Sequence, residues 1–441
     1  MILAHGIGGR SDLPVPLWLA LYGGAFAVLV SFFALLVFWT EPRLTGSEAG
    51  RPLPYGLQRL IDADATRAVL QGVGLVLLGV TLAAAWIGPD DAAKNPAPTW
   101  MYVWFWVGLA PLSALYGPVW RLLNPLRALA AGLRLLKFPS RALPEWVGYW
   151  PAVASLLAFV WLELVYGANA SAPRTVAVFI SGYAVIHVVL GAIFGDEWFD
   201  RGDGFQVYST LLGHLSPFGR RDDGELVVRN PLNSLASLEE SAAPGLVAVV
   251  CVLLGSTGFD GLTRGFFWKD LVAAYASDSR LLYLGIGTAG LAVAVGFVLV
   301  SFTAATRASR IYALPEYASD IEPRFVHSLL PILMGYTVAH YFSFAVFQGQ
   351  AGYLYATDPF GIGWNLFGTA GAAIDYTLVS PQAIALIQVG AIVTGHVLGV
   401  VAAHDRAVAI FRPKEQRSGQ YPLLAIMIAY TVGGITLVVG T

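Results

Sequence analysis

The chain has 441 residues, of which 56% are hydrophobic and 12% are charged, and its net charge is −2. Soluble domains carry about 25% charged residues, so this composition excludes an ordinary water-soluble protein, and it lacks the basic surface that a nucleic-acid partner requires. The single cysteine, Cys251, excludes a disulfide framework and an iron–sulfur ligand set.

Ten stretches of the sequence are apolar and long enough to cross a membrane, which takes about 20 residues. We therefore predict an all-α fold, a polytopic bundle of about ten transmembrane helices that forms a single integral membrane domain over 1–441. The predicted spans are 16–40, 68–88, 100–119, 146–167, 175–194, 244–259, 282–305, 326–346, 381–403 and 421–440.

Lysine and arginine alternate between the loops that join these spans. The first, third, fifth, seventh and ninth loops hold 20 of the 26 basic residues, whereas 347–380 holds none. Loops rich in lysine and arginine stay on the cytoplasmic side of a membrane. The pattern therefore predicts that both termini are extracytoplasmic and that the protein lies in the plasma membrane of a bacterium.

Three loops have distinctive compositions. Residues 120–140 space arginines against leucine and alanine, which is typical of a helix lying in the headgroup plane. Residues 195–243 mix acids, bases and aromatics, and 204–215 predicts a second interfacial helix. Both loops are expected to pack at the cytoplasmic membrane surface. The extracytoplasmic loop 347–380 is rich in glycine and aromatics, so we expect it to fold back over the outer mouth of the bundle.

Four ionisable residues, Glu163, His187, His340 and His396, stand inside predicted spans. Such residues are rare and costly in lipid, so each one is a functional hypothesis. At a rise of about 1.5 Å per residue, His187 and His396 lie at a common depth near the cytoplasmic side. His340 and Glu163 lie in the outer half, so the sequence predicts two levels of ionisable groups.

The lower level, His187 and His396, lies beside small residues. Gly395 and Gly399 form a GxxxG spacing around His396, and Gly191 follows His187 by one turn. Two histidines in this setting suit the axial ligands of a haem b or a proton relay. The structural alternative is that each imidazole simply forms hydrogen bonds between helices.

The upper level joins polar residues at the predicted outer mouth. Carboxylates with histidine suit a divalent cation, and glycines near the N-terminus suit an anion bound by backbone N–H groups. No spacing is diagnostic, so the metal stays undetermined, and loop ends that satisfy their own polar groups are the structural alternative. The candidate solute or ion pathway comprises His340, Asp375, Asp260, Glu163 and Tyr336, and the candidate outer mouth comprises His5, Arg10, Asp12 and Asp358.

Ten spans also divide into two sets of five, and an odd number per set inverts the second set relative to the first. Many secondary transporters have this topology. Pro111 in the third span and Pro331 in the eighth interrupt corresponding helices. No similarity between individual residues links the two sets, so the inverted arrangement stays one option.

Three phrases resemble those of uncharacterised multi-pass membrane proteins of bacteria, especially of actinobacteria. They are AHGIGGRSDLP at the start, GSTGFDG after the sixth span and VGAIVTGHVLGVVAAHDRA in the ninth. The resemblance covers most of the chain. It implies a polytopic membrane protein, and it carries no activity, cofactor or site residue.

Together these features predict a secondary transporter or permease for a small solute or ion. No GxxxxGK(S/T) motif is present, so a gradient is the expected source of energy. The expected partners are the lipid bilayer, the solute and further membrane subunits. The alternative is a membrane redox subunit that binds haem b or a quinone through His187 and His396. A membrane-embedded enzyme that uses Asp90 and Asp91 ranks last.

Overall fold

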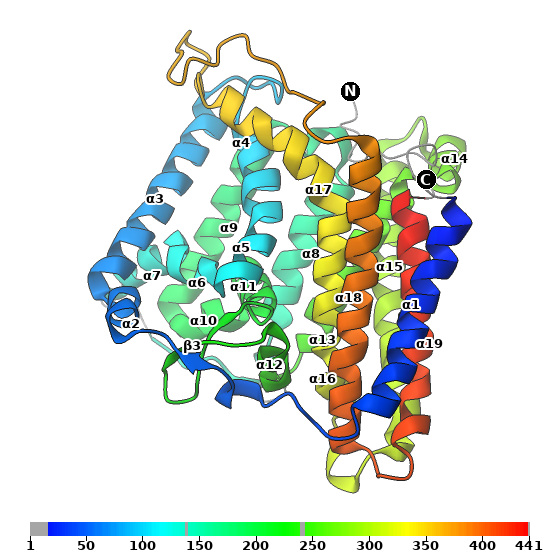
Figure 1. The fold of residues 1–441 in the computed structure, drawn as a ribbon. Helices are drawn as coiled ribbons and strands as arrows, with labels where there is room; N and C mark the ends of the chain where they lie inside the picture. Colours follow the sequence, from blue (N-terminus) through cyan, green and yellow to red (C-terminus); the bar gives the residue numbers. More distant parts are fainter. Residues whose placement is uncertain (1–15, 137–139, 239–242, 440–441) are drawn as a thin grey trace.

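The computed structural model describes residues 16–136, 140–238 and 243–439, and the fold is nearly all-α. Nine helices within these ranges are long and apolar enough to cross a membrane (Figure 1). They are α1 (Leu17–Phe38), α3 (Asp64–Ile87), α8 (Trp150–Leu164), α9 (Pro173–Phe194), α13 (Leu246–Arg264), α15 (Arg280–Ser309), α17 (Leu329–Tyr355), α18 (Pro381–Ile410) and α19 (Gln416–Val439).

The predicted span 100–119 is also helical, but it is built from three segments. These are α4 (Ala97–Thr99), the π-helical segment η3 (Trp100–Val107) and α5 (Gly108–Tyr116). Pro111 lies inside α5 and has no N–H to donate to the carbonyl of Val107. A wider π turn directly before this position is a common response to such a break. The all-α bundle of about ten spans is therefore confirmed.

Shorter elements lie between the spans. Most of them belong to the loops that are rich in lysine and arginine. They are η2 (Gly46–Glu48), β1 (Arg51–Pro52), α2 (Tyr55–Asp62), α6 (Val119–Leu123), α7 (Pro125–Leu135), η4 (Glu145–Val147), η5 (Gly167–Asn169), α10 (Asp196–Arg201), α11 (Gly204–Gly213), β2 (Phe218–Arg220), β3 (Leu226–Val228), α12 (Pro231–Ala236), α14 (Phe266–Ala276), η7 (Arg310–Tyr312), η8 (Pro315–Tyr317) and α16 (Ile321–Val326).

The spans form two groups that share one junction (Figure 1). The first group contains α3, η3 with α5, and α9, and the second contains α1, α13, α15, α17, α18 and α19. Helix α8 lies at the junction, because it packs against α13 and its Phe159 ring contacts rings of η3 and α9. Helix α1 packs against α18 and α19 rather than against the spans that follow it in sequence. The packing groups therefore do not follow the two sets of five along the sequence, because α1 of the first set joins the second group, and the inverted arrangement stays a prediction.

The five basic loops gather on one face of the bundle, which we call the basic face. Strand β1 of the first loop pairs antiparallel with β3 of the fifth, and α6 of the third loop packs on α11 of the fifth. The backbone N–H of Arg43 donates to Asp405 Oδ1 over 2.6 Å, and Ala313 of the seventh loop bridges to Phe411 of the ninth. Helix α14 and residues 356–380 lie at the opposite face (Figure 1). The alternation of charge in the sequence thus agrees with the fold.

Single-cysteine labelling tests this arrangement. The native Cys251 is buried in α13, so we expect it not to react. Glu316→Cys lies on the basic face and Ala373→Cys on the opposite face, and both positions are exposed. In intact cells, a membrane-impermeant maleimide should label Ala373→Cys alone, and Glu316→Cys should react only after lysis. Labelling of both variants from outside would contradict the topology.

Candidate functional site

Three ionisable side chains meet where α13 packs against α17; we call them the buried triad. Asp260 and Arg264 lie one turn apart on α13, and His340 comes from α17. Arg264 Nη2 lies 2.8 Å from His340 Nε2 and 3.2 Å from Asp260 Oδ2. His340 Nε2 also contacts Asp260 Oδ2 directly. Asp260 is 6% exposed and His340 is 2% exposed, whereas the side chain of Arg264 is 24% exposed, so the triad reaches the surroundings only through Arg264.

The position of one proton decides how the buried triad is hydrogen-bonded. When Nε2 of His340 carries a hydrogen, it donates to the carboxylate of Asp260. When Nε2 carries a lone pair, it accepts from the guanidinium of Arg264. The same three side chains therefore support two states, and the change between them requires a proton rather than a large movement.

Glu163 approaches the buried triad from α8, at the junction between the helix groups. Its carboxylate interacts electrostatically with Asp260 and Arg264. Glu163 Oε2 is buried and has no hydrogen-bond partner among the residues that the structure describes, and the same holds for Ser343 Oγ, one turn beyond His340. An unpaired buried polar atom costs about 1–3 kcal/mol. These two atoms lower the stability of the bundle, which favours a functional reason for their presence.

Helix α11 enters the bundle from the basic face and packs against α5, α8 and α17. Nine of its ten residues are buried, and Tyr208 stacks on Trp106 with 4.6 Å between the ring centroids. The chain turns inward at Gly195, which has a φ of +80°. It then passes close to α8 at Gly204, where a Cβ would lie 2.5 Å from Ser155 Oγ. The segment 204–215 is therefore a helix inside the bundle rather than one at its surface.

Asp203 fixes the N-terminus of α11, where the chain enters the bundle. Its side chain caps α11 by accepting from the N–H groups of Phe205 (3.1 Å) and Gln206 (3.3 Å). It also accepts from Asn124 Nδ2 over 2.8 Å and from the hydroxyl of Tyr183 over 2.6 Å. Asp203 is fully buried, and four donors compensate for that burial.

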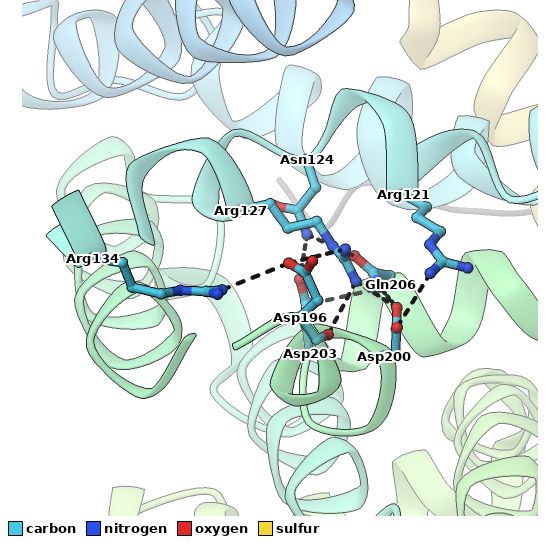
Figure 2. A network of polar contacts seen from close by, with 8 residues as sticks. All are labelled: Arg121, Asn124, Arg127, Arg134, Asp196, Asp200, Asp203 and Gln206. Carbon is cyan, nitrogen blue, oxygen red and sulfur yellow. Dashed lines mark hydrogen bonds and ion pairs between the residues drawn. The ribbon is translucent and has the colours of Figure 1, made fainter. Parts of the chain in front are cut away.

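Arg127 of α7 extends the same network toward the basic face. Its Nε donates to Gln206 Oε1 over 3.0 Å, and its guanidinium contacts Asp200 and lies 3.4 Å from Asp196 Oδ1. Burial lowers the pKa of Arg127 from its ordinary value, and the two aspartates oppose that shift. Figure 2 shows the members of this Arg127 network, which are Arg121, Asn124, Arg127, Arg134, Asp196, Asp200, Asp203 and Gln206.

The Arg127 network joins α7, α10 and α11, and its buried amides and carboxylates are paired. Such a network fixes one arrangement of its elements, which is here the inward position of α11. The sequence analysis did not select Asp200, Asp203, Asn124 or Gln206. The available signal was the acidic run 196–203, which lies opposite the arginines of the 120–140 loop.

No protein-family model matches this chain, and neither a curated protein nor a solved structure is similar to it. The chemistry of the site therefore has to be argued from its own residues. Among the described residues, no three histidine, cysteine or acidic side chains come close enough together to hold a metal ion.

His187 and His396 lie in separate helix groups. Nδ1 of His187 accepts from the indole of Trp198 over 3.0 Å, and its ring lies 4.1 Å from that of Tyr183. His396 is fully buried, and its Nδ1 donates to the carbonyl of Ile392 over 2.8 Å. The structure does not bring the two imidazoles together, although they lie at similar predicted depths.

The glycines beside these histidines are occupied by neighbouring helices. A Cβ on Gly191 would lie 2.3 Å from the ring of Phe199. A Cβ on Gly395 would lie 2.6 Å from the carbonyl of Pro331, and one on Gly399 would lie 2.7 Å from that of Ser328. The space that a haem would require is filled by α10 and α17, so the small residues serve close helix packing.

The remaining predicted site residues lie apart from the buried triad. The hydroxyl of Tyr336 donates to the carbonyl of Tyr430 over 2.6 Å. Hydrogen bonds from Thr377 lower the pKa of Asp375, which is exposed in the loop after α17. Asp358 accepts from backbone N–H groups of its own loop. His5, Arg10 and Asp12 lie outside the described residues.

Replacing Asp203 tests the Arg127 network as a structural clamp. We expect Asp203→Ala to lower the free energy of unfolding by about 3 kcal/mol, because a helix cap and two buried donors lose their acceptor. Ser380 caps α18 at an exposed position through Ala383 alone. Ser380→Ala should therefore cost only about 1 kcal/mol. Denaturant titration in detergent measures both losses, and equal losses would contradict the clamp.

The visible spectrum tests the packing around the histidines. Because helices fill the space beside His187 and His396, we expect the purified protein to show no Soret band, with or without added haem. Absorption that disappears in His396→Ala would contradict this interpretation and would restore the redox alternative.

Proposed function

We propose that this protein is a secondary permease that couples the movement of a small solute or ion to a proton. One observation supports the proposal more strongly than any other. Ionisable side chains from three helices, Glu163 of α8 and the buried triad of α13 and α17, meet at the junction between the groups. The proposed location is the plasma membrane of a bacterium, with the basic face toward the cytoplasm.

The energetic cost of the site supports this reading. Ionisable residues inside a membrane are expensive and usually belong to substrate or proton pathways. Glu163 and the triad residue His340 each accept and release a proton, whereas Arg264 stays charged. A protein that needed only stability would place apolar side chains at this junction.

The arrangement of helices suggests how a proton changes the conformation. Protonated His340 is positively charged and donates from Nε2 to Asp260, and when the Nε2 proton leaves the triad, neutral His340 accepts from Arg264 and the charge that faces Glu163 falls by one. Glu163 belongs to α8 and the triad to α13 and α17, so this change alters the attraction between α8 and these two helices. Movement of one helix group against another about a fixed site is the usual basis of alternating access.

Solute-driven proton movement tests the proposal. We expect proteoliposomes that contain the full chain and a pH-sensitive dye to respond to one class within a panel of organic acids, amines, inorganic ions and single-chain amphiphiles. Glu163→Gln and His340→Asn should slow that response by at least about tenfold, because each removes a proton-binding group and keeps a similar shape.

Asp270→Asn is the matched control, because it removes the same charge at an exposed position of α14. It should leave the response unchanged. If no class in the panel moves protons, or if the two junction variants move them at the normal rate while remaining folded, the permease proposal is wrong.

A further inference from the structure

A groove runs along the junction between the two helix groups, on the side that faces the lipid. Its volume is about 590 Å³, within the usual range for sites that bind small molecules. Val103, Val107 and Pro111 form one wall, and Val346, Gly349 and Tyr353 of α17 form the other. The walls are almost entirely apolar.

The groove opens sideways rather than toward water. Trp104 and Tyr353, which line it, are 47% and 48% exposed at the surface of the bundle. The indole nitrogens of Trp100 and Trp104 donate to the carbonyls of Gly352 and Gly349, each over 2.9 Å, and join the two walls in the part of α17 that leads into the loop 356–380. The groove therefore lies in the half of the membrane away from the basic face.

Local features keep this space open. The π-helical segment and Pro111 widen the third span along the groove. Gly349 has no side chain to fill it, and a Cβ built there would meet only Val103 Cγ1 at 3.8 Å and Trp104 Nε1 at 3.9 Å. A methyl group would fit without touching the backbone of a neighbouring helix, so close helix packing does not explain this glycine.

The loop beside the groove suits contact with lipid. Residues 356–380 contain no lysine or arginine, and Ile362, Leu366 and Leu378 are each about 60% exposed. The loop is attached to the groove, because the ring of Phe367 lies 5.7 Å from that of Tyr353. Exposed apolar side chains of this kind mark a surface that meets a membrane.

We propose that the groove binds the acyl chain of an uncharged, single-chain lipid from the membrane half opposite the basic face. The walls offer hydrocarbon contact, the opening faces hydrocarbon, and no charged side chain lines the groove to attract an ionised headgroup. The role of the bound lipid rests on the proposed function, because we take this amphiphile to be the solute that the permease transports. The binding itself does not depend on transport.

Photolabelling tests the groove directly. The full-length protein in phosphatidylcholine nanodiscs is irradiated with a monoacylglycerol that carries a diazirine in its acyl chain, and the labelled peptides are identified by mass spectrometry. We expect label on 103–111 and 345–354, and we expect unlabelled monoacylglycerol to compete for it. Gly349→Leu should reduce this labelling about tenfold, because the new side chain occupies the groove.

Two variants serve as controls. Gly349→Ala adds a Cβ that fits in the available space, and Gly182→Leu adds the same bulk as Gly349→Leu on the exposed surface of α9. Both should retain labelling, and the thermal stability of each variant is measured in parallel. Labelling that spreads evenly over all exposed helices, or that survives Gly349→Leu, would overturn the proposal. Equal competition by a fatty acid would overturn the choice of an uncharged headgroup.

The two proposals fail separately. If monoacylglycerol labels the groove but drives no proton movement in proteoliposomes, the groove remains a lipid-binding site. The inference that such an amphiphile is the transported solute is then wrong. If another class of the panel moves protons while the groove stays unlabelled, the permease proposal stands and the groove proposal is overturned.

Discussion

Hydrocarbon offers no hydrogen-bond partner, and this constraint governs the interior of the bundle. Where the chain leaves regular helix, as between α9 and α11, the polar groups exposed by the turn find partners inside the protein. Asp203 alone satisfies four donors there. Glu163 Oε2 is one of several buried polar atoms without a partner in the described part of the chain, and it belongs to an ionisable group that interacts with the buried triad. The buried amides and carboxylates of the Arg127 network are paired, whereas one oxygen of the carboxylate at the junction is not, and this contrast separates the structural polar groups from the functional candidates.

The packing within the second helix group differs from the packing at the junction between the groups. The second group is held together by close backbone contact, as at Gly395 and Gly399 between α17 and α18. The junction between the groups is built differently, from aromatic rings, a π-helical segment, the lipid-facing groove and the ionisable residues. One hydrophobic core crosses this junction, so the helices there are held together through side chains rather than through close backbone contact. The polar chemistry lies at the junction.

The sequence predicted the membrane fold well because hydropathy and loop charge are local signals that lipid imposes on each span. It also selected Asp260, His340 and Glu163, since a buried charge stands out in an apolar run. It could not reveal that Asp260 and His340 touch, or that His187 and His396 do not, because depth along a helix says nothing about which helices are neighbours. Helix α11 was expected at the surface, because a short polar-flanked helix has the same composition whether it lies on the bundle or inside it.

The position of α1 has a consequence for biosynthesis. This helix is the first to leave the ribosome among the described spans, yet its packing partners are α18 and α19, the last two. At translation rates of about 5–20 residues per second, its final neighbours have emerged roughly 20–80 seconds later. During that interval α1 stays in the lipid as an isolated helix or is bound by a membrane chaperone. The second helix group is thus completed late in synthesis. A chain that is truncated before α18 would leave α1 without its packing partners.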